Sequence, residues 1–541
     1  MWQPLSEPTF RAIWLTSLLS NFGQLIQGVG AAWEMTQLTP EANMVALVQT
    51  AVFLPLMLLL LPAGALADMY DRRKVALSGL AFAFVSAVLL TAFSLADLLT
   101  PWVLLAFCFL IGSGVALFGP AWQASVREQV KLEHLPAAIG LSSISYNVAR
   151  SVGPAIGGVL VATFGSVAAF GINALMCLPI IAAFYFWKRT QVSSRLPPER
   201  IDRAIQAGVR YSIHSPPIRV LLIRTLVAAS GVASITALIP LVAKQLLGGG
   251  PGTYGLLLGS FGVGAVIGAM FVDGARRKTD PEAMIRLLVI ATGVMIVVVG
   301  ASRSLPLTLA ALGLCGACWM LMSSLFNVGV QLSAPRWVTA RALACWGVAV
   351  TGGMAIGAWV WGSIADNVGV GPTLVIAGVA VAASMLVGFI LPVPAVEKAE
   401  LDMEELRIEP EVNMGLSLRS GPIVIELEYR VELEQARDFY AAMLVLRRAR
   451  LRSGAFDWSL SRDIAEPQLW IERYHCPTWG DYLRQRDRAT QSDREVEQKA
   501  AQFDHSFGGI RVRRRLERPI GSVRWRADTP DQGDATLIYP P

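Results

Sequence analysis

The sequence predicts an all-α polytopic membrane protein with twelve transmembrane helices in two pseudo-symmetric six-helix bundles, followed by a soluble α+β domain of the ferredoxin-like type. Three observations lead to this prediction. Charge is scarce in the first 392 of the 541 residues, apolar runs of membrane-spanning length recur there, and motifs of the first half reappear about 200 residues later. Near the end of the chain, the pattern changes to the two-residue alternation of β-strands.

Charge is divided unevenly along the chain. Residues 1–392 carry 23 Lys and Arg and 14 Asp and Glu, whereas residues 393–541 carry 23 and 26. The first segment has too little charge to cover a water-facing surface, and the second has too much to lie in lipid. This excludes a purely soluble enzyme and a chain that lies wholly in the membrane. The net charge of +6 comes mostly from loops beside apolar runs and indicates no nucleic-acid partner.

Twelve apolar runs have about the length that a helix needs to cross a lipid bilayer. Lipid offers no partner to free backbone N–H and C=O groups, so such runs are expected to be helices. The runs cover residues 12–33, 44–67, 75–96, 102–123, 137–162, 167–187, 220–243, 253–272, 285–302, 307–330, 343–364 and 371–392.

Basic residues gather in the loops on one side of these runs. The loops after the second, fourth, sixth, eighth and tenth runs hold 18 Lys and Arg, whereas the opposite loops hold only Lys244 and Arg303. Loops rich in Lys and Arg stay in the cytoplasm. We therefore expect a multi-pass protein of the inner (cytoplasmic) membrane with the bilayer as its partner and both termini in the cytoplasm.

An internal repeat relates the two halves. The Gly and the Arg-Arg-Lys of residues 64–74 recur 204 positions later in residues 268–278, and the small-residue pattern of 149–158 recurs in 349–358. Such a repeat predicts one bundle over residues 1–187 and a second over 218–392, with the substrate handled between them. In the connector, residues 188–217, apolar residues every four positions predict an amphipathic helix on the inner membrane surface.

The loop after the second run resembles a motif of the major facilitator superfamily, Gly64-x-Leu-Ala-Asp68-x-x-x-Arg72-Arg73. The resemblance implies the major facilitator fold. It also implies that Gly64 permits close helix contact and that Asp68, Arg72 and Arg73 form an inner charge latch between the halves, with Arg127 as the partner of Asp68. The sequence departs from the motif at positions 69 and 71. In the alternative interpretation, the charges of residues 71–74 only anchor a short loop.

The fifth run carries Gly153-Pro154-x-x-Gly157-Gly158, which resembles the signature of antiporter-type exporters. Small residues four apart allow a neighbouring helix to approach, and proline bends a helix, so we expect this motif to seal the two halves on the outer side. Arg150 lies on the same helix face as Asn147 and Gly153. A charge so deep in a span is costly. Arg150 either pins the helix to neighbouring carbonyl groups or contributes to gating and substrate contact.

Polar residues without charge are the candidates for the substrate path, and acidic residues are the candidates for the proton carrier. We expect six of the former to face a central path: Gln24, Gln27, Gln49, Gln123, Asn327 and Gln331. The proton carriers would be Glu34 and Asp68. No metal site or cofactor is expected, because the four histidines lie outside the apolar runs. Cys315 and Cys318 have redox-motif spacing but lie inside an apolar run, which favours packing.

The end of the chain is predicted to hold a Glu-rich linker (393–420), a folded domain (421–519) and a disordered tail (520–541). Alternation and helical periodicity predict the order β-α-β-β-α-α-β within the domain, with the first strand at residues 423–431. This order suggests a ferredoxin-like sandwich.

This domain is similar to the dimeric α+β barrel of antibiotic-biosynthesis monooxygenases. The most telling segment includes Arg450, Trp458, Glu472, Trp479 and Tyr482. Nearly the whole chain resembles the transmembrane secretion effectors, a bacterial branch that includes enterobactin-exporter-like proteins. The resemblance implies dimerisation through this domain, or catalysis with Trp458, Trp470 and His475 in a pocket beside the sheet.

These patterns predict a proton-coupled exporter of small hydrophobic or amphipathic molecules (siderophores, drugs or lipid-like compounds) that works by alternating access and is not an enzyme. The alternative is a membrane-anchored enzyme or sensor whose monooxygenase-like domain carries the activity. Turnover by the isolated residues 421–519 would favour the alternative.

Overall fold

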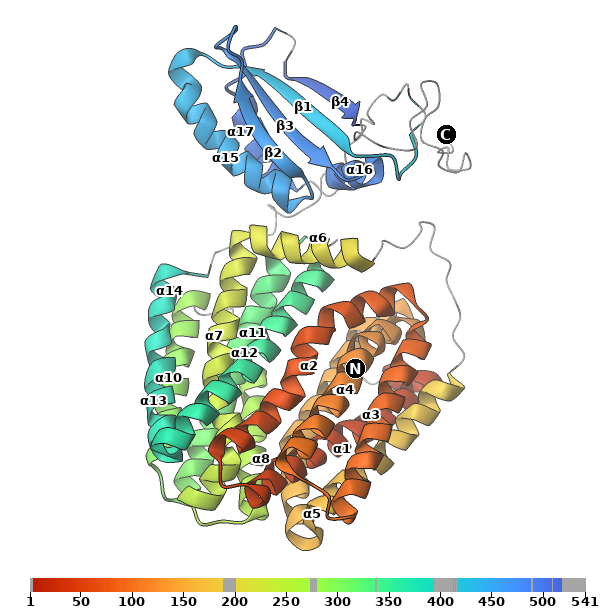
Figure 1. Ribbon diagram of the computed structural model, residues 1–541, viewed down its shortest axis with the longest axis vertical. Helices are drawn as coiled ribbons and strands as arrows, with labels where there is room; N and C mark the ends of the chain where they lie inside the picture. Colours follow the sequence, from red (N-terminus) through yellow and green to blue (C-terminus); the bar gives the residue numbers. More distant parts are fainter. Residues whose placement is uncertain are drawn as a thin grey trace. The chain divides into compact units, whose positions relative to one another are not determined.

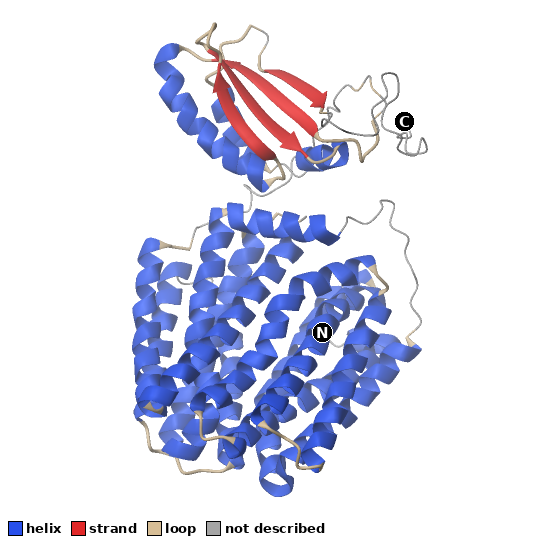
Figure 2. Ribbon diagram, in the orientation of Figure 1, coloured by secondary structure: helices blue, strands red, loops and turns tan. Residues whose placement is uncertain are grey.

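Long helices occupy the first 393 residues of the protein (Figures 1 and 2). The computed structural model describes residues 3–187, 201–272, 280–335, 338–393, 412, 414, 416–487, 490–507 and 509–517. The helices are α1 (Pro8–Leu38), α2 (Ala42–Met69), α3 (Arg72–Leu95), α4 (Pro101–Gln129), α5 (Leu135–Phe186), α6 (Ile201–His214), α7 (Pro216–Leu241), α8 (Pro251–Met270), α10 (Pro281–Ala301), α11 (Leu305–Leu332), α12 (Thr339–Val368), α13 (Val370–Ala383) and α14 (Val387–Ile390).

Local chemistry sets several helix ends. The Asp71 carboxylate accepts hydrogen bonds from the backbone N–H groups of Arg73, at 2.9 Å, and Lys74, at 3.4 Å, so it caps α3. Thr100 and Asp280 cap α4 and α10 in the same way. Within α5, Gly165 has a φ of 78° and a ψ of 173°, which breaks the helix between the fifth and sixth predicted runs. Glycine suits such a break because it has no Cβ.

Ten helices among the described residues are long and apolar enough to cross a membrane. One of them, Ala137–Phe186, runs across the break at Gly165 and is counted once, and α1 is not among the ten. The chain is therefore a mostly helical, polytopic membrane protein, and the count of twelve stays a prediction.

The predicted repeat has a counterpart in helix packing. Gly153 and Gly157 of α5 contact α1, where a Cβ on Gly157 would lie 3.1 Å from the Ile26 Cα. At the positions 200 residues later, Gly353 and Gly357 of α12 contact α7 in the same manner. The two halves thus place glycines on equivalent helix pairs.

The chain divides into two compact units. One consists of residues 1–205, 220–329 and 343–393, and the other of residues 206–219, 330–342 and 394–541. The predicted connector begins with residues 188–200, which lie outside the described residues, and most of its remainder forms α6. Most of the predicted linker and all of residues 520–541 also lie outside them.

The second unit contains a four-stranded antiparallel sheet with strand order β2-β3-β1-β4. Its elements are β1 (Ile423–Arg430), α15 (Ala436–Arg452), β2 (Phe456–Arg462), β3 (Leu469–Cys476), α16 (Trp479–Asp487), α17 (Gln491–Ala501) and β4 (Arg511–Leu516). They follow one another in the predicted order β-α-β-β-α-α-β.

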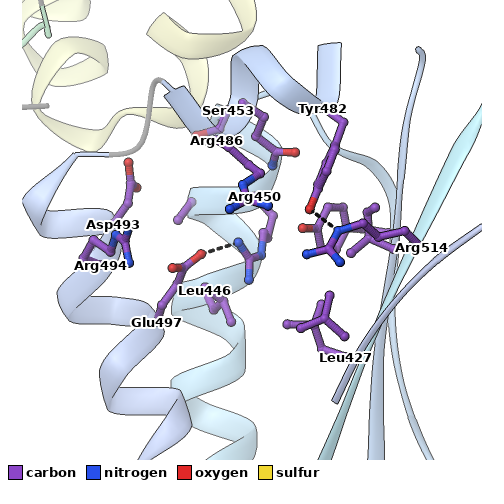
Figure 3. Close-up of a pocket in the computed structure, with 15 residues that line it drawn as sticks. Leu427, Leu446, Arg450, Ser453, Tyr482, Arg486, Asp493, Arg494, Glu497 and Arg514 are labelled. Carbon is purple, nitrogen blue, oxygen red and sulfur yellow. Dashed lines mark hydrogen bonds and ion pairs between the residues drawn. The ribbon is translucent and has the colours of Figure 1, made fainter. Parts of the chain in front are cut away.

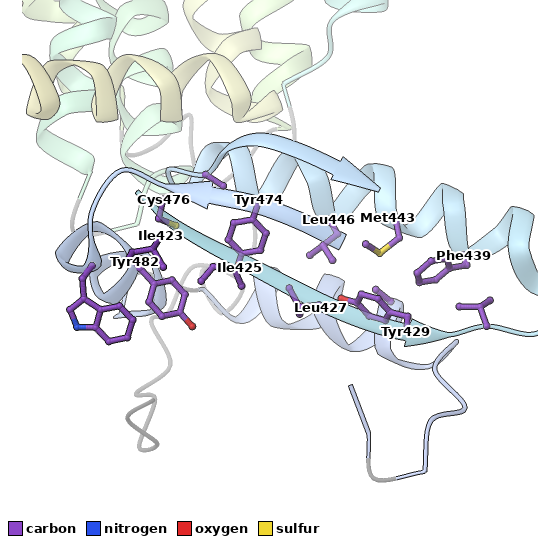
Figure 4. Packing of buried hydrophobic residues seen from close by; sticks show 14 residues of the cluster. Ile423, Ile425, Leu427, Tyr429, Phe439, Met443, Leu446, Tyr474, Cys476 and Tyr482 are labelled. Atoms are coloured by element: carbon purple, nitrogen blue, oxygen red, sulfur yellow. The ribbon is translucent and has the colours of Figure 1, made fainter. Parts of the chain in front are cut away.

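The core of this domain lies between the sheet and α15 (Figure 4). Alternate residues of β1, from Ile423 to Tyr429, are buried and pack with Phe439, Met443 and Leu446 of α15. Glu426 and Glu428, which alternate with them along β1, form ion pairs with Arg515 and Arg513 of β4. One face of the sheet is therefore apolar, and the other carries a ladder of ion pairs.

Candidate functional site: a cavity shared by the two helical halves

A cavity of about 500 Å³ lies within the helical unit. Residues of α1, α2, α4 and α5 line it from the first half, and residues of α7, α8, α11 and α12 line it from the second. Its walls are mostly apolar, as is usual for small-molecule sites. The polar lining consists of Asn21, Gln24, Gln27, Gln49, Tyr146, Arg150, Thr236, Tyr254 and Ser323.

Among the described residues that line this cavity, Arg150 alone carries a charge. Its guanidinium carbon lies 5.6 Å from the ring centroid of Phe261 on α8, in a cation–π contact. Within the described part of the chain, the guanidinium donates no hydrogen bond to a side chain or carbonyl group. Its donors are thus available to a molecule in the cavity.

Three of the six predicted path residues line the cavity: Gln24, Gln27 and Gln49. Gln27 is buried, and its side-chain oxygen accepts a hydrogen bond from Asn173 in the second part of α5. The other three predicted residues, Gln123, Asn327 and Gln331, are not among the lining residues. Gln123 is exposed on α4.

Asn21 also lines the cavity, although it was not among the predicted path residues, and its amide donates to the Ser145 hydroxyl at 3.3 Å. A polar residue within an apolar run was the available signal for it. No signal marked the aromatic residues of the wall, such as Trp319 and Phe261, because helices that are apolar all round do not show which face is inward.

The glycine motif of α5 meets two different neighbours. Gly153 and Gly157 contact α1 of the same half, whereas Gly158 contacts α8 of the other half. A Cβ on Gly158 would lie 2.7 Å from the Pro251 carbonyl oxygen and 2.8 Å from the Gly255 Cα. Pro154 lines the cavity, and its carbonyl oxygen would lie 2.6 Å from a Cβ on Gly255. Within the motif, Gly158 and Pro154 are therefore the residues that face the other half.

Further contacts join the halves at the bundle end where α1 passes to α2. The Asp366 carboxylate of α12 accepts hydrogen bonds from the backbone N–H groups of Ala42, at 2.6 Å, and Asn43, at 3.2 Å, at the start of α2. Lys244 donates to the Thr36 carbonyl oxygen. The rings of Trp33 and Tyr254 stack with centroids 6.5 Å apart. We call the contacts of Asp366, Lys244 and the Trp33–Tyr254 pair the α1–α2 end contacts.

The described contacts of the predicted charge latch lie within the first half. Arg72 pairs with Glu128 of α4 at 2.9 Å, and Arg73 donates to the Phe184 carbonyl oxygen at 2.9 Å, so both arginines bind helices of their own half. Arg127 is exposed, and the side chain of Asp68 lies outside the described residues. Among the described residues, no atom lies within 4 Å of a Cβ on Gly64.

A buried ion cluster that the sequence did not predict lies at the bundle end where α7 and α10 begin. Glu282 of α10 pairs with Arg224 of α7 and, at 2.7 Å, with Arg286. It also accepts a hydrogen bond from the Val393 N–H at 2.9 Å. The cluster therefore joins α7 and α10 to the chain that leaves α14. Arg224 and Glu282 are 58 positions apart in the sequence, so no local pattern indicated that they would pair.

In the tail domain, the predicted catalytic trio does not converge. Trp458 and Trp470 face the helices, whereas His475 lies on the other face of the sheet, beside the Phe456 ring and 3.3 Å from the Glu517 carboxylate. A β-bulge with a positive φ at Asp457 separates Trp458 from Phe456. Trp458 instead donates to the fully buried Glu472 at 2.9 Å.

Glu472 has two further partners, the Tyr429 hydroxyl at 3.1 Å and the Arg450 guanidinium at 3.2 Å. Burial, together with the adjacent Glu472 charge, raises the pKa of Tyr429 well above its usual value, so this hydroxyl remains a donor. Glu472 thus accepts hydrogen bonds from three donors within the tail domain. Among the described residues, no group of three or more His, Cys, Asp or Glu is placed to hold a metal ion.

Comparison with known proteins finds relatives that are described as transporters. The multidrug efflux pump Tap of Mycolicibacterium fortuitum is 25% identical over 378 residues, which cover 67% of this chain and 90% of Tap. The enterobactin exporter EntS of Shigella boydii is 23% identical over 370 residues, which cover 66% and 86%. A POT family transporter crystallised with 5-aminolevulinic acid has a TM-score of 0.57 at 12% identity, covering 70% of this chain and 95% of that one, and shares the fold.

The family description of transmembrane secretion effectors matches residues 1–520, the helical unit and the tail domain included. Since this match covers nearly the whole chain, the protein belongs to the transmembrane secretion effectors, a family of major facilitator transporters.

Proposed function

We propose that the protein is a proton-coupled exporter of small amphipathic molecules that works by alternating access. The proposal includes twelve membrane crossings in two bundles of six, with α1 and the two parts of α5 counted separately and both termini in the cytoplasm. The excess of Lys and Arg in the loops of one side supports this orientation.

The observation that carries the proposal is the cavity lined by both halves, with Arg150 as its single charge among the described residues. An apolar cavity with one cation and no acid favours a neutral or anionic amphiphile and disfavours a cation. The relatives are described as a multidrug efflux pump and an enterobactin exporter, which supports export of an amphipathic compound. Siderophores, drugs and lipid-like molecules are the substrate classes to test.

Alternating access requires that the α1–α2 end contacts open and close. In the proposed orientation they lie on the outer side, so the conformation described is closed outward. The Asp366 carboxylate accepts backbone hydrogen bonds from Ala42 and Asn43, and the Lys244 ammonium donates one to the Thr36 carbonyl oxygen. Contacts of this kind suit an interface that separates in every cycle.

For the coupling proton, we propose Asp68 and Glu34 as carriers. Glu34 is half-buried near the end of α1, beside Trp33 of the α1–α2 end contacts. A carboxylate near this interface would respond to protonation from the outer side.

We propose that the tail domain is a ferredoxin-like, non-catalytic module that resembles the monooxygenases in fold and mediates dimerisation. The full use of Glu472 in hydrogen bonds, together with the separation of His475 from the two tryptophans, supports a structural role over catalysis.

The direct test is flux in proteoliposomes that hold a pH gradient, with a panel of siderophores, drugs and lysolipids. We expect gradient-driven transport of at least one compound, and reduced transport by Asp68→Asn and Glu34→Gln. Arg303→Gln is the control and should transport normally, because Arg303 lies in the loop between α10 and α11 and does not line the cavity. Absence of gradient-driven flux for every compound in the wild type, with turnover by the isolated tail, would overturn the proposal.

A further inference from the structure

The tail domain contains a second cavity, of about 240 Å³, between the sheet and its helices (Figure 3). Ile425 and Leu427 of β1, Leu446 of α15 and Val512 of β4 form an apolar wall. Arginines from α15, α16, α17 and β4 line the remainder. The cavity is therefore apolar on one side and rich in hydrogen-bond donors on the other.

Cationic donors exceed anions around this cavity. Four arginines line it (Arg450, Arg486, Arg494 and Arg514), together with two acids. Both acids are already paired, Asp493 with Arg452 and Glu497 with Arg450. Arg450 is also paired with Glu472, so its charge is largely neutralised.

Arg514 is the donor with spare capacity. Its Nε donates to the Tyr482 hydroxyl at 2.7 Å, which fixes the guanidinium beside the cavity (Figure 3). Its two terminal nitrogens have no hydrogen-bond partner among the described residues. A guanidinium offers parallel N–H groups that match a carboxylate.

Gln485 provides a second, independent observation. This side chain is 7% exposed and lines the cavity. Its Oε1 accepts from the Cys476 thiol at 3.1 Å, whereas its Nε2 has no partner among the described residues. A buried donor without an acceptor is costly, and such groups are usually paired in native structures. A ligand oxygen would supply the missing acceptor.

We propose that this tail cavity binds a small amphipathic anion, a carboxylate on an apolar body. The carboxylate accepts from the terminal nitrogens of Arg514 and from Gln485 Nε2, and the body packs on the apolar wall formed by β1, α15 and β4. This site is separate from the membrane cavity, and it requires no catalysis by the tail.

Hydrogen–deuterium exchange of the full-length protein in nanodiscs can test the proposal, because it locates protection within the chain. The probes are naphthoate, naphthylmethanol and naphthylmethylamine, which share one ring system and differ in charge. We expect naphthoate to protect peptides of α16 and β4, the alcohol to need about tenfold higher concentration, and the amine to give no protection.

Two variants and one matched control complete the test. Arg514→Gln and Gln485→Leu should each weaken protection by naphthoate about tenfold, whereas Arg514→Lys should retain part of it. Arg515→Gln removes the same side chain from the next position of β4, on the opposite face of the sheet, and should bind as the wild type does. The exchange pattern without probe shows whether each variant is folded. Equal protection by the three probes, no protection by naphthoate, or unchanged protection in both folded variants would overturn the proposal.

Discussion

Arg150 and Glu472 are both charged side chains beside apolar surroundings, but their partners differ. Arg150 contacts one aromatic ring and has no hydrogen-bond partner among the described residues. Glu472 accepts from three donors within the tail core. A charge that the fold has fully partnered stabilises the fold, whereas a charge left open beside a cavity is available to a ligand.

Replacing Glu472 tests its structural role. In Glu472→Leu, Arg450 loses a buried partner, and we expect the tail domain to lose about 3 kcal/mol of unfolding free energy. Limited proteolysis of the full-length protein along a urea series measures this loss. Glu466→Gln, which removes an exposed ion pair with Arg430, should change stability by less than about 0.5 kcal/mol. Equal effects of the two substitutions would contradict a structural role for Glu472.

Cys476 provides a test of the core by its reactivity. Burial raises the pKa of its thiol to about 12, so the thiol is protonated and enclosed at neutral pH. The nucleophile in alkylation is the thiolate. Iodoacetamide near pH 8 should therefore leave Cys476 unmodified in the folded protein and modify it in urea, as mass spectrometry of the peptide can show. Ser461→Cys, at an exposed position of β2, should react in both states. Rapid alkylation of folded Cys476 would contradict the packing described.

At the scale of helices and strands, the sequence predicted much of the architecture because apolar length and period are local signals. The apolar runs lie in helices of the structure, and the residues that alternate around Ile425 form the strand β1. Side-chain neighbours could not be predicted in the same way. The motif from Gly153 to Gly158 gave no sign that its glycines would face two different helices, because the residues of the motif itself are all apolar.

The tail shows the same limit. Burial of Glu472 depends on three partners that come from separate elements, and no local period reveals such a set. The bulge at Asp457 redirects Trp458, which simple alternation would place on the face of Phe456. Asp71, at a position where the sequence departs from the family motif, is the N-terminal cap of α3. Each of these differences arises from tertiary contact or turn geometry rather than from hydrophobic pattern.

The contact between α5 and α8 can be tested with a matched pair of glycines. In Gly158→Ala, the new methyl group meets the backbone of Pro251 and Gly255, which cannot move aside cheaply. We expect a loss of about 1–3 kcal/mol, seen as a lower melting temperature of the purified protein. Gly140 is in the same helix, and a Cβ there would meet no atom within 4 Å, so Gly140→Ala should be neutral or slightly stabilising. Equal melting temperatures for the two variants would contradict this close contact.

At the scale of the whole transporter, the α1–α2 end contacts determine which conformation is populated. The Asp366 carboxylate interacts with the positive end of α2, an interaction worth up to about 1 kcal/mol. Asp366→Asn removes this charge interaction and should favour opening of the α1–α2 end contacts. Labelling of a cysteine introduced by Ser323→Cys, at a half-buried position that lines the cavity, by an impermeant maleimide from outside should then become about threefold faster.

Asp97→Asn is the control for this measurement. Asp97 is exposed in the loop between α3 and α4, on the same predicted side, and its positive φ suits asparagine equally well. The labelling rate in Asp97→Asn should equal that in the protein with the natural Asp97. If Asp366→Asn labels no faster than Asp97→Asn, the carboxylate does not hold this end closed.

Selection of neutral and anionic amphiphiles by Arg150 can be tested by the transport of compounds that share one ring system and differ in charge. The measurement is pH-gradient-driven flux of naphthoate, naphthylmethanol and naphthylmethylamine in proteoliposomes, for the wild type, Arg150→Gln and the control Arg303→Gln. We expect the wild type and the control to transport the anion and exclude the amine, and Arg150→Gln to lower anion flux about tenfold without lowering that of the alcohol. Preferential transport of the amine by the wild type, or unchanged anion flux in Arg150→Gln, would show that Arg150 does not select the substrate.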